Sequence, residues 1–254
     1  ASNVSLALSA GLFYYYDGAG YWSIEQARGL TGPGWFLAKG VGGFEDRSEF
    51  INTDWAAAAA PGVKWRIQTV TAPADVAGRG GIQRFGTATV TPCVLDGLTN
   101  AYSAQDGWRM YARFAIQSDA NDFYGVGVCD APAAVAPNSI PYVNDAALIV
   151  HISGLGANFF HRTVVAAGAV SVDTGIPAVI GEYVRVDQIA LTNRQIQLHI
   201  NGTFVTTSVA VQSPLAATLL RKVLHANNSG AAVAAYLDID VYDIVEGRNV
   251  AVTP

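Results

Sequence analysis

Three aspartates near the end of this 254-residue chain have the types and spacing that could do chemistry. Asp238, Asp240 and Asp243 lie in the run YLDIDVYD, and strand alternation places the first two on one face, opposite the apolar residues between them. Two neighbouring carboxylates can transfer protons or bind Ca²⁺. No second ligand cluster accompanies them, so we predict no metal site, with Asp238 and Asp240 as the only candidates. We interpret both as the solvated edge of a terminal strand.

A second polar group surrounds His199. Gln195, Gln197 and His199 alternate with apolar residues, and Phe204 should lie opposite His199 across a hairpin. Amides, an imidazole and an aromatic ring can bind a sugar by hydrogen bonds and stacking. The same residues can also form an outer sheet face that packs on another chain or on the N-terminal aromatic residues. None of the four histidines has the spacing of metal ligands: His151, His161, His199 and His225.

Arg109 and Arg113 form a third candidate group, with Tyr111 between them on the same strand face. One interpretation is an ordinary polar sheet face. The other is a pair of anchors for a carboxylate on a neighbouring subunit, because guanidinium groups bind carboxylates through two parallel hydrogen bonds.

The elements that position these residues have a period of two from about residue 87 onward. Residues 110–117 alternate apolar and polar, the pattern of a half-buried strand. Asn201-Gly202 separates two alternating runs and predicts a type I′ hairpin, with Leu198 opposite Val205 towards the core and His199 opposite Phe204. The further predicted strands are 123–129, 146–152, 159–165, 183–191, 194–200, 203–209 and 236–245.

Helical signals are few. Residues 53–60 have a cap, an alanine run and a Pro-Gly stop, and residues 213–217 begin with Ser-Pro, so one or two short helices are expected. Nothing alternates as βαβ units. The pattern predicts an all-β protein of two packed antiparallel sheets.

The N-terminal part of the chain is dense in aromatic residues and glycine. We predict a single domain, 1–254, in which residues 1–70 form an aromatic, glycine-rich arm or covering segment and residues 71–254 form the core. Aromatic residues of this arm are candidates for an assembly interface completed by a neighbouring subunit. These are Tyr14, Tyr15, Tyr16, Tyr21, Trp22, Trp35 and Phe36.

The composition excludes several functions. Charged residues make up only 14%, just three are lysines, and the net charge is −5. Such a chain is too apolar to be disordered, has no basic run for nucleic acid and no apolar stretch long enough to span a membrane. A surface this poor in charge is expected to contact other proteins. Cys93 and Cys129 are expected to be buried free thiols, and the start at Ala1 is expected from removal of an initiator Met.

The order of these signals resembles a known family. Residues 78–86 (GRGGIQRFG) precede a strand that begins near Thr87, and strand 108–117 follows. Strand 183–187 then leads into the hairpin 195–205, and YLDIDVYD comes last. Over about residues 75–250 this order resembles the concanavalin A-like lectin/glucanase jelly roll, in the form found in phage virion proteins. The resemblance implies an antiparallel jelly-roll β-sandwich and does not choose among the lectins, hydrolases, lyases and virion proteins of that family.

Two catalytic patterns of the resembled family are incomplete in this chain. Its retaining glucanases use Glu-x-Asp-x-x-Glu, whereas both glutamates are aspartates in the run that starts at Asp238. Its lyases use Gln-x-His, which Gln197 and His199 match, but the accompanying Arg-rich and Tyr/Lys-rich strands are missing. We therefore predict no enzyme and no cofactor.

Within this family, the low charge, the high aromatic, alanine and glycine content and the missing catalytic residues predict a non-enzymatic structural protein on the outer surface of a bacteriophage virion, as a capsid decoration (cement) or appendage protein. Its expected partners are the major capsid protein or appendage subunits and further copies of itself, with no nucleic acid and no membrane. The alternative is a carbohydrate-binding or glycan-depolymerising protein of the same fold, for example on a tail fibre, with a surface glycan as its partner.

Overall fold

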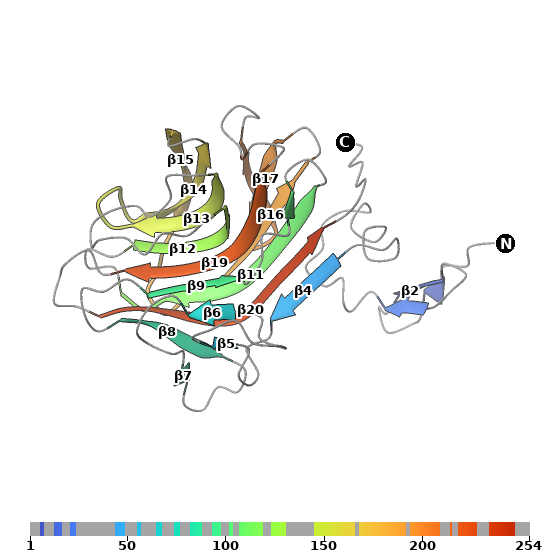
Figure 1. The fold of residues 1–254 in the computed structure, drawn as a ribbon, viewed down its shortest axis with the longest axis horizontal. Helices are drawn as coiled ribbons and strands as arrows, with labels where there is room; N and C mark the ends of the chain where they lie inside the picture. The colour runs from blue at the N-terminus through green and yellow to red at the C-terminus, as the bar shows by residue number, and fades with distance from the viewer. Residues whose placement is uncertain are drawn as a thin grey trace.

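A computed structural model gives the fold of the chain (Figure 1). It describes residues 6–7, 13–16, 21–23, 44–48, 55–56, 65–67, 74–76, 82–87, 93–97, 102–103, 107–118, 123–130, 145–165, 168–191, 194–208, 214, 218–227 and 234–246.

The described residues form strands and no helices. A three-stranded sheet comprises β1 (Leu6–Ala7), β2 (Phe13–Tyr16) and β3 (Tyr21–Ser23). A nine-stranded sheet comprises β15 (Gly168–Pro177), β14 (Asn158–Val165), β13 (Ala146–Ile152), β12 (Phe123–Cys129), β19 (Leu219–Asn227), β9 (Cys93–Gly97), β6 (Trp65–Ile67) and β5 (Trp55–Ala56) in this order, with β10 (Tyr102–Ser103) also on β19. An eight-stranded sheet comprises β18 (Thr203–Thr207), β17 (Ile196–Ile200), β16 (Val184–Ala190), β11 (Trp108–Ile116), β20 (Ala235–Glu246), β8 (Gln83–Thr87) and β7 (Ala74–Asp75), with β4 (Phe44–Ser48) also on β20.

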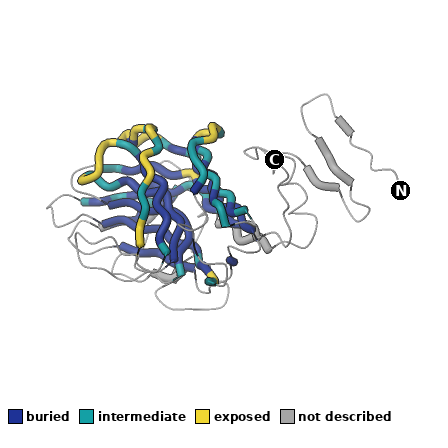
Figure 2. Tube along the Cα trace, turned by 90° about the horizontal axis from the view of Figure 1, so that it is seen from above, coloured by how far each residue is buried: buried dark blue, intermediate teal, exposed yellow. Residues whose placement is uncertain are grey.

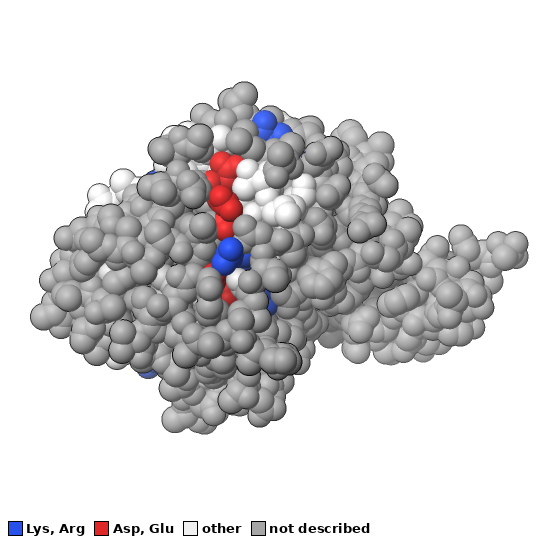
Figure 3. Space-filling model, viewed as in Figure 1, with Lys and Arg blue, Asp and Glu red and all other residues white. Residues whose placement is uncertain are grey.

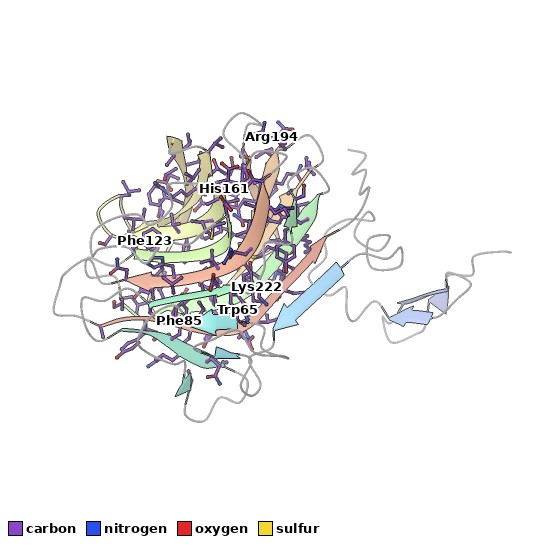
Figure 4. All side chains as sticks on the ribbon, viewed as in Figure 1. Trp65, Phe85, Phe123, His161, Arg194 and Lys222 are labelled. Atoms are coloured by element: carbon purple, nitrogen blue, oxygen red, sulfur yellow. The ribbon has the colours of Figure 1, made fainter. Side chains whose placement is uncertain are left out.

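The two large sheets pack face to face around one apolar core, which confirms the predicted all-β antiparallel sandwich. Every second residue of β11, from Trp108 to Ile116, is buried in this core. Trp65 contacts Tyr242 edge-to-face at 5.1 Å between ring centroids, and the Nζ of Lys222 lies 4.4 Å from the Trp65 ring (Figure 4). Figure 2 shows that the middle strands are buried while the exposed residues gather at one side of the sandwich.

Both cysteines are free and buried, as expected from the sequence. Burial raises the pKa of the Cys129 thiol well above its ordinary value, so this thiol is protonated and unreactive at neutral pH. In the part of the chain that the structure describes, no helix is long and apolar enough to cross a bilayer.

The hairpin at Asn201-Gly202 is confirmed, with one change of register. Asn201 and Gly202 have φ angles of 52° and 83°, as a type I′ turn requires, and His199 pairs with Phe204. The predicted pairing of Leu198 with Val205 is wrong. The register shifts between Leu198 and His199, so that Leu198 pairs with Thr206. A β-bulge therefore adds one residue to the second strand.

Two other predictions are corrected. Residues 53–60 were expected to be helical, but Trp55–Ala56 forms strand β5, which pairs with β6. The strand expected to begin near Thr87 instead ends there, because β8 pairs with β20 through residues 83–87. The second expected helix, at 213–217, lies outside the described residues apart from Pro214.

Candidate functional site

The candidate site is the outer face of the eight-stranded sheet, called the polar face below. Its central strand β11 turns its even-numbered residues into the core and therefore turns Arg109, Tyr111 and Arg113 outwards. Cross-strand pairing places Asp187 of β16 and Asp243 of β20 directly opposite Tyr111 on its two sides. Directly opposite residues of neighbouring strands share a face, so three strands contribute charged and aromatic groups to this surface.

A bulge in β20 keeps its three aspartates on the polar face. Leu237 and Ile239 enter the core before the bulge, and Tyr242 and Ile244 enter it afterwards, so the buried positions change from odd to even numbers. The register shifts opposite the step between Arg113 and Phe114 of β11. The extra residue lets carboxylates at spacings of two and three residues point the same way.

Arg109 and Asp187 form an ion pair at the centre of the polar face. Their side chains are only 3% and 1% exposed. Burial lowers the pKa of Arg109 and raises the pKa of Asp187, and the opposite charges partly offset both shifts. A guanidinium group stays charged in proteins, so the pair is retained as an internal salt bridge.

Asp238 is held by two side chains from neighbouring strands. Arg84 donates two hydrogen bonds, from Nε to Oδ1 at 2.6 Å and from Nη2 to Oδ2 at 2.8 Å, and Gln117 donates from Nε2 to Oδ2 at 2.9 Å. Hydrogen bonding to Asp238 raises the pKa of Arg84. The prediction of a solvated strand edge is wrong here, because β20 lies between β11 and β8 and Asp238 is 2% exposed.

Asp240 also accepts a hydrogen bond from an arginine, Arg113, whose guanidinium lies 4.8 Å from the centre of the Tyr183 ring. Figure 3 shows acidic and basic side chains that meet in one stripe on the face in view. A glycosidase acid must hold a proton at the glycosidic oxygen, and its partner must be available to attack. Here both carboxylate oxygens of Asp238 accept hydrogen bonds, from Arg84 and Gln117. Such contacts suit a residue that stabilises the sheet.

The structure brings together Gln197, His199 and Phe204 of the predicted sugar-binding group. Ile196, Leu198 and Ile200 of β17 point into the core, so Gln197 and His199 lie on its outer face. The rings of His199 and Phe204 meet edge-to-face at 5.5 Å, and Phe204 is 54% exposed. Burial lowers the pKa of His199, which keeps its ring neutral at pH 7, able to donate and to accept. Gln195 precedes the strand and is half-buried.

The assembly candidates have different outcomes. Arg109 and Arg113 each have a carboxylate partner in their own chain, Asp187 and Asp240. The partner predicted on a neighbouring subunit is thus supplied from within, and burial leaves Arg109 unavailable to another chain. The aromatic candidates lie outside the residues whose side chains the structure describes: Tyr14, Tyr15, Tyr16, Tyr21, Trp22, Trp35 and Phe36.

Sequence reasoning missed the partners that define the polar face: Arg84, Gln117 and Asp187. Arg84 and Gln117 lie 154 and 121 positions from Asp238, and Asp187 lies 78 positions from Arg109. Only the strand order brings them together. Among the described residues, no group of three His, Cys, Asp or Glu side chains is arranged to hold a metal ion.

No protein-family model and no curated protein matches this chain. A protein of unknown function from Shewanella oneidensis MR-1 superposes with a TM-score of 0.59 and 11% identity, over 89% of this chain and 98% of its own. An endo-acting O-glycanase that members of the human gut microbiota express to initiate mucin breakdown has a TM-score of 0.59 and 10% identity, over 79% and 98%. The β-glucanase of Bacillus licheniformis has 0.54 and 13%, over 80% and 97%.

Two of these three proteins process glycans according to their names. At such low identity the similarity concerns the fold alone. The order of strands, the two packed sheets and these superpositions together show that the chain has the concanavalin A-like jelly-roll fold.

Proposed function

We propose that this protein is a non-enzymatic structural protein of a bacteriophage virion, a capsid decoration or appendage protein that acts through protein–protein interfaces. The observation that carries the proposal is a set of exposed apolar side chains along β15 and the turns at its C-terminal end, called the apolar rim below. It comprises Leu155, Val172, Val179 and Ile180, which are 52%, 40%, 44% and 47% exposed.

The composition of the apolar rim is unusual for a surface that faces only water. The Ala178 amide donates to the Ala157 carbonyl at 2.8 Å, which joins the turn that contains Leu155 to the end of β15. Residues 168–182 include two acidic side chains, Asp173 and Glu182, and no lysine or arginine. Beside this strand, Arg162 of β14 donates from Nη1 to the Ser171 hydroxyl at 2.8 Å. Exposed apolar groups on one surface are typical of surfaces that bind protein.

Two further points support a structural role. The candidate acids Asp238 and Asp240 are engaged by Arg84 and Arg113. The low content of charge extends along the whole chain, and the resemblance set out from the sequence is to virion proteins. A protein whose function is assembly needs buried interface area and no cofactor.

The native mass of the protein, and its binding to purified particles, test this function. We expect an oligomer that binds particles. Deletion of residues 1–20 should abolish this binding, because the aromatic arm is predicted to supply much of the interface, while the circular dichroism of the sandwich is retained. A monomer that binds no particle component, or a truncated protein that binds as well as the full chain, contradicts the proposal.

Glycan binding is the second candidate, favoured by the exposed Phe204 ring beside His199 on the polar face. On a glycan array we expect saturable binding if this function holds. His199→Ala should then weaken binding by about tenfold, since it removes one hydrogen bond and a ring contact. Thr203→Ala, at an exposed residue of the same hairpin, is the matched control. No saturable binding, or equal loss in both variants, rejects this candidate.

A further inference from the structure

Among the described residues, strand β15 (Gly168–Pro177) is an edge strand. It pairs with β14 on one side and forms the end of the nine-stranded sheet on the other. Every second residue of an edge strand directs its N–H and C=O groups away from the sheet. Among the described residues, no backbone hydrogen bond joins residues 168–173 to anything other than β14.

The N-terminal half of β15 is regular enough to accept another strand. Its register with β14 is continuous from Gly168 opposite Val165 to Asp173 opposite Phe160. The irregularity is confined to the C-terminal half, where the Thr174 hydroxyl donates to the Phe159 carbonyl at 2.6 Å. Regular pairing on one side keeps the backbone extended, as pairing on the other side requires.

This edge lacks the features that usually prevent pairing. Exposed edges are commonly protected by lysines, by proline, or by charged side chains that point outwards. β15 contains no lysine or arginine, and its only proline is its last residue. Its one charged side chain, Asp173, accepts hydrogen bonds from Asn158 Nδ2 at 2.9 Å and from the Gly175 amide at 2.8 Å, so it is held against its own chain.

The side chains on this edge would gain from a partner strand. Val172 is 40% exposed although it belongs to a sheet whose middle strands are buried throughout. Ala169 and Ser171 are small, so another backbone can approach closely. Burying a half-exposed valine and filling unpaired backbone groups both favour the addition of a strand.

We propose that β15 pairs with β15 of a second copy of this chain, antiparallel about a two-fold axis at Val172. This register places Asp173 opposite Ser171 and Val170 opposite Thr174, so no acid faces an acid. A two-fold axis at Asp173 would instead oppose two carboxylates, which is unfavourable. A positively charged partner would find only one carboxylate here, and that carboxylate is already hydrogen-bonded.

This pairing limits the assembly to two copies. The same edge is used in both copies, and the other end of the sheet is β5. An interface that uses one patch twice gives a dimer and not a fibre. The two nine-stranded sheets thereby become one continuous sheet. This inference rests on the proposed assembly function and names the first contact of that assembly.

Val172→Lys is the decisive variant, and Leu219→Lys is its matched control. Leu219 is similarly exposed, at 49%, but lies at the start of β19, outside the apolar rim. We expect the wild-type protein to be dimeric by sedimentation velocity. Val172→Lys should raise the dimer dissociation constant by about a hundredfold, because two ammonium groups would oppose each other at the axis. Leu219→Lys should leave it unchanged, and both variants should keep the wild-type circular dichroism.

A cross-link tests the register. Val172→Cys should form a disulfide between two copies under mild oxidation, whereas Leu219→Cys should not, and Cys93 and Cys129 are buried. A monomeric wild type, a Val172→Lys variant that associates like the wild type, equal dissociation of both lysine variants or a failed Val172 cross-link overturns the inference. If particles still bind the Val172→Lys variant fully while its dimer is lost, the dimer stands and the assembly function does not depend on it. If wild-type dimers form but bind no particle, only the virion function fails.

Discussion

Between pH 6.5 and about 4 the protein will lose stability steeply, because His161 and His225 are buried as neutral rings. His161, in β14, lies opposite Ile149 of β13, and its Nε2 has no hydrogen-bond partner among the described residues. His225 contacts Phe123 edge-to-face at 5.0 Å. Burial lowers the pKa of His161 to about 4 and that of His225 to about 3. Figure 4 shows His161 on its strand within the sandwich.

The direction of the effect follows from which state binds the protons. In the unfolded chain both rings have a pKa near 6.5, so they take up protons as the pH falls below that value, whereas the folded protein does not. The stability that depends on these two neutral rings is therefore fully present above pH 6.5 and decreases as the pH falls below that value. Each histidine raises the unfolding equilibrium constant by about tenfold per pH unit until its folded pKa is reached. The two together give about a hundredfold per unit.

Urea unfolding at a series of pH values between 7 and 4.5 measures this slope. His161→Leu and His225→Leu should each reduce the slope by about one proton, and the double variant should remove most of it. His199→Gln is the comparison: burial lowers the pKa of this ring too, but His199 is only half-buried, so its removal should reduce the slope less than either leucine variant does. Slopes that are the same in the wild type and in both leucine variants contradict the prediction.

The strands that can be predicted from the sequence are those with one apolar face. Alternation correctly predicts β11 and the strands on each side of the hairpin, because each of these strands has one apolar face. It misses β19 because Arg221, Lys222 and His225 interrupt the apolar residues of a strand that is buried on both faces. It also misses β15, where Val170, Val172 and Ile176 do alternate with small or polar residues, because two glycines and a proline in ten residues favour a loop.

The polar face was predictable only residue by residue. The sequence places Arg109, Arg113, Asp238 and Asp240 on outward faces, and the structure agrees, whereas Asp243 faces outwards only because of the bulge. The burial of Asp238 was not predictable, since it depends on β20 lying between two other strands and on the reach of Arg84. Register shifts had no local signal either. A bulge depends on the neighbouring strand as much as on its own residues.

Arg109→Met will destabilise the protein by about 3–5 kcal/mol, the usual cost of removing one partner from a buried ion pair. Arg109 is the only hydrogen-bond partner that the described residues provide for the Asp187 carboxylate, whose side chain is 1% exposed. The remaining carboxylate must then be buried uncompensated or take up a proton. Its pKa, already raised by burial, should rise further, so the deficit of the variant should shrink as the pH falls.

The double variant Arg109→Met/Asp187→Leu separates the charge effect from lost packing. Removing both charges leaves no buried ion, and such replacements are often neutral or stabilising, so most of the lost stability should return. Arg113→Met is the matched single variant, because Arg113 is 45% exposed and its pair with Asp240 should contribute less than about 1 kcal/mol. Urea unfolding of the four proteins at pH 7 and pH 5 measures these differences. A double variant as unstable as Arg109→Met would mean that the guanidinium stabilises the sheet through its packing and not through its charge.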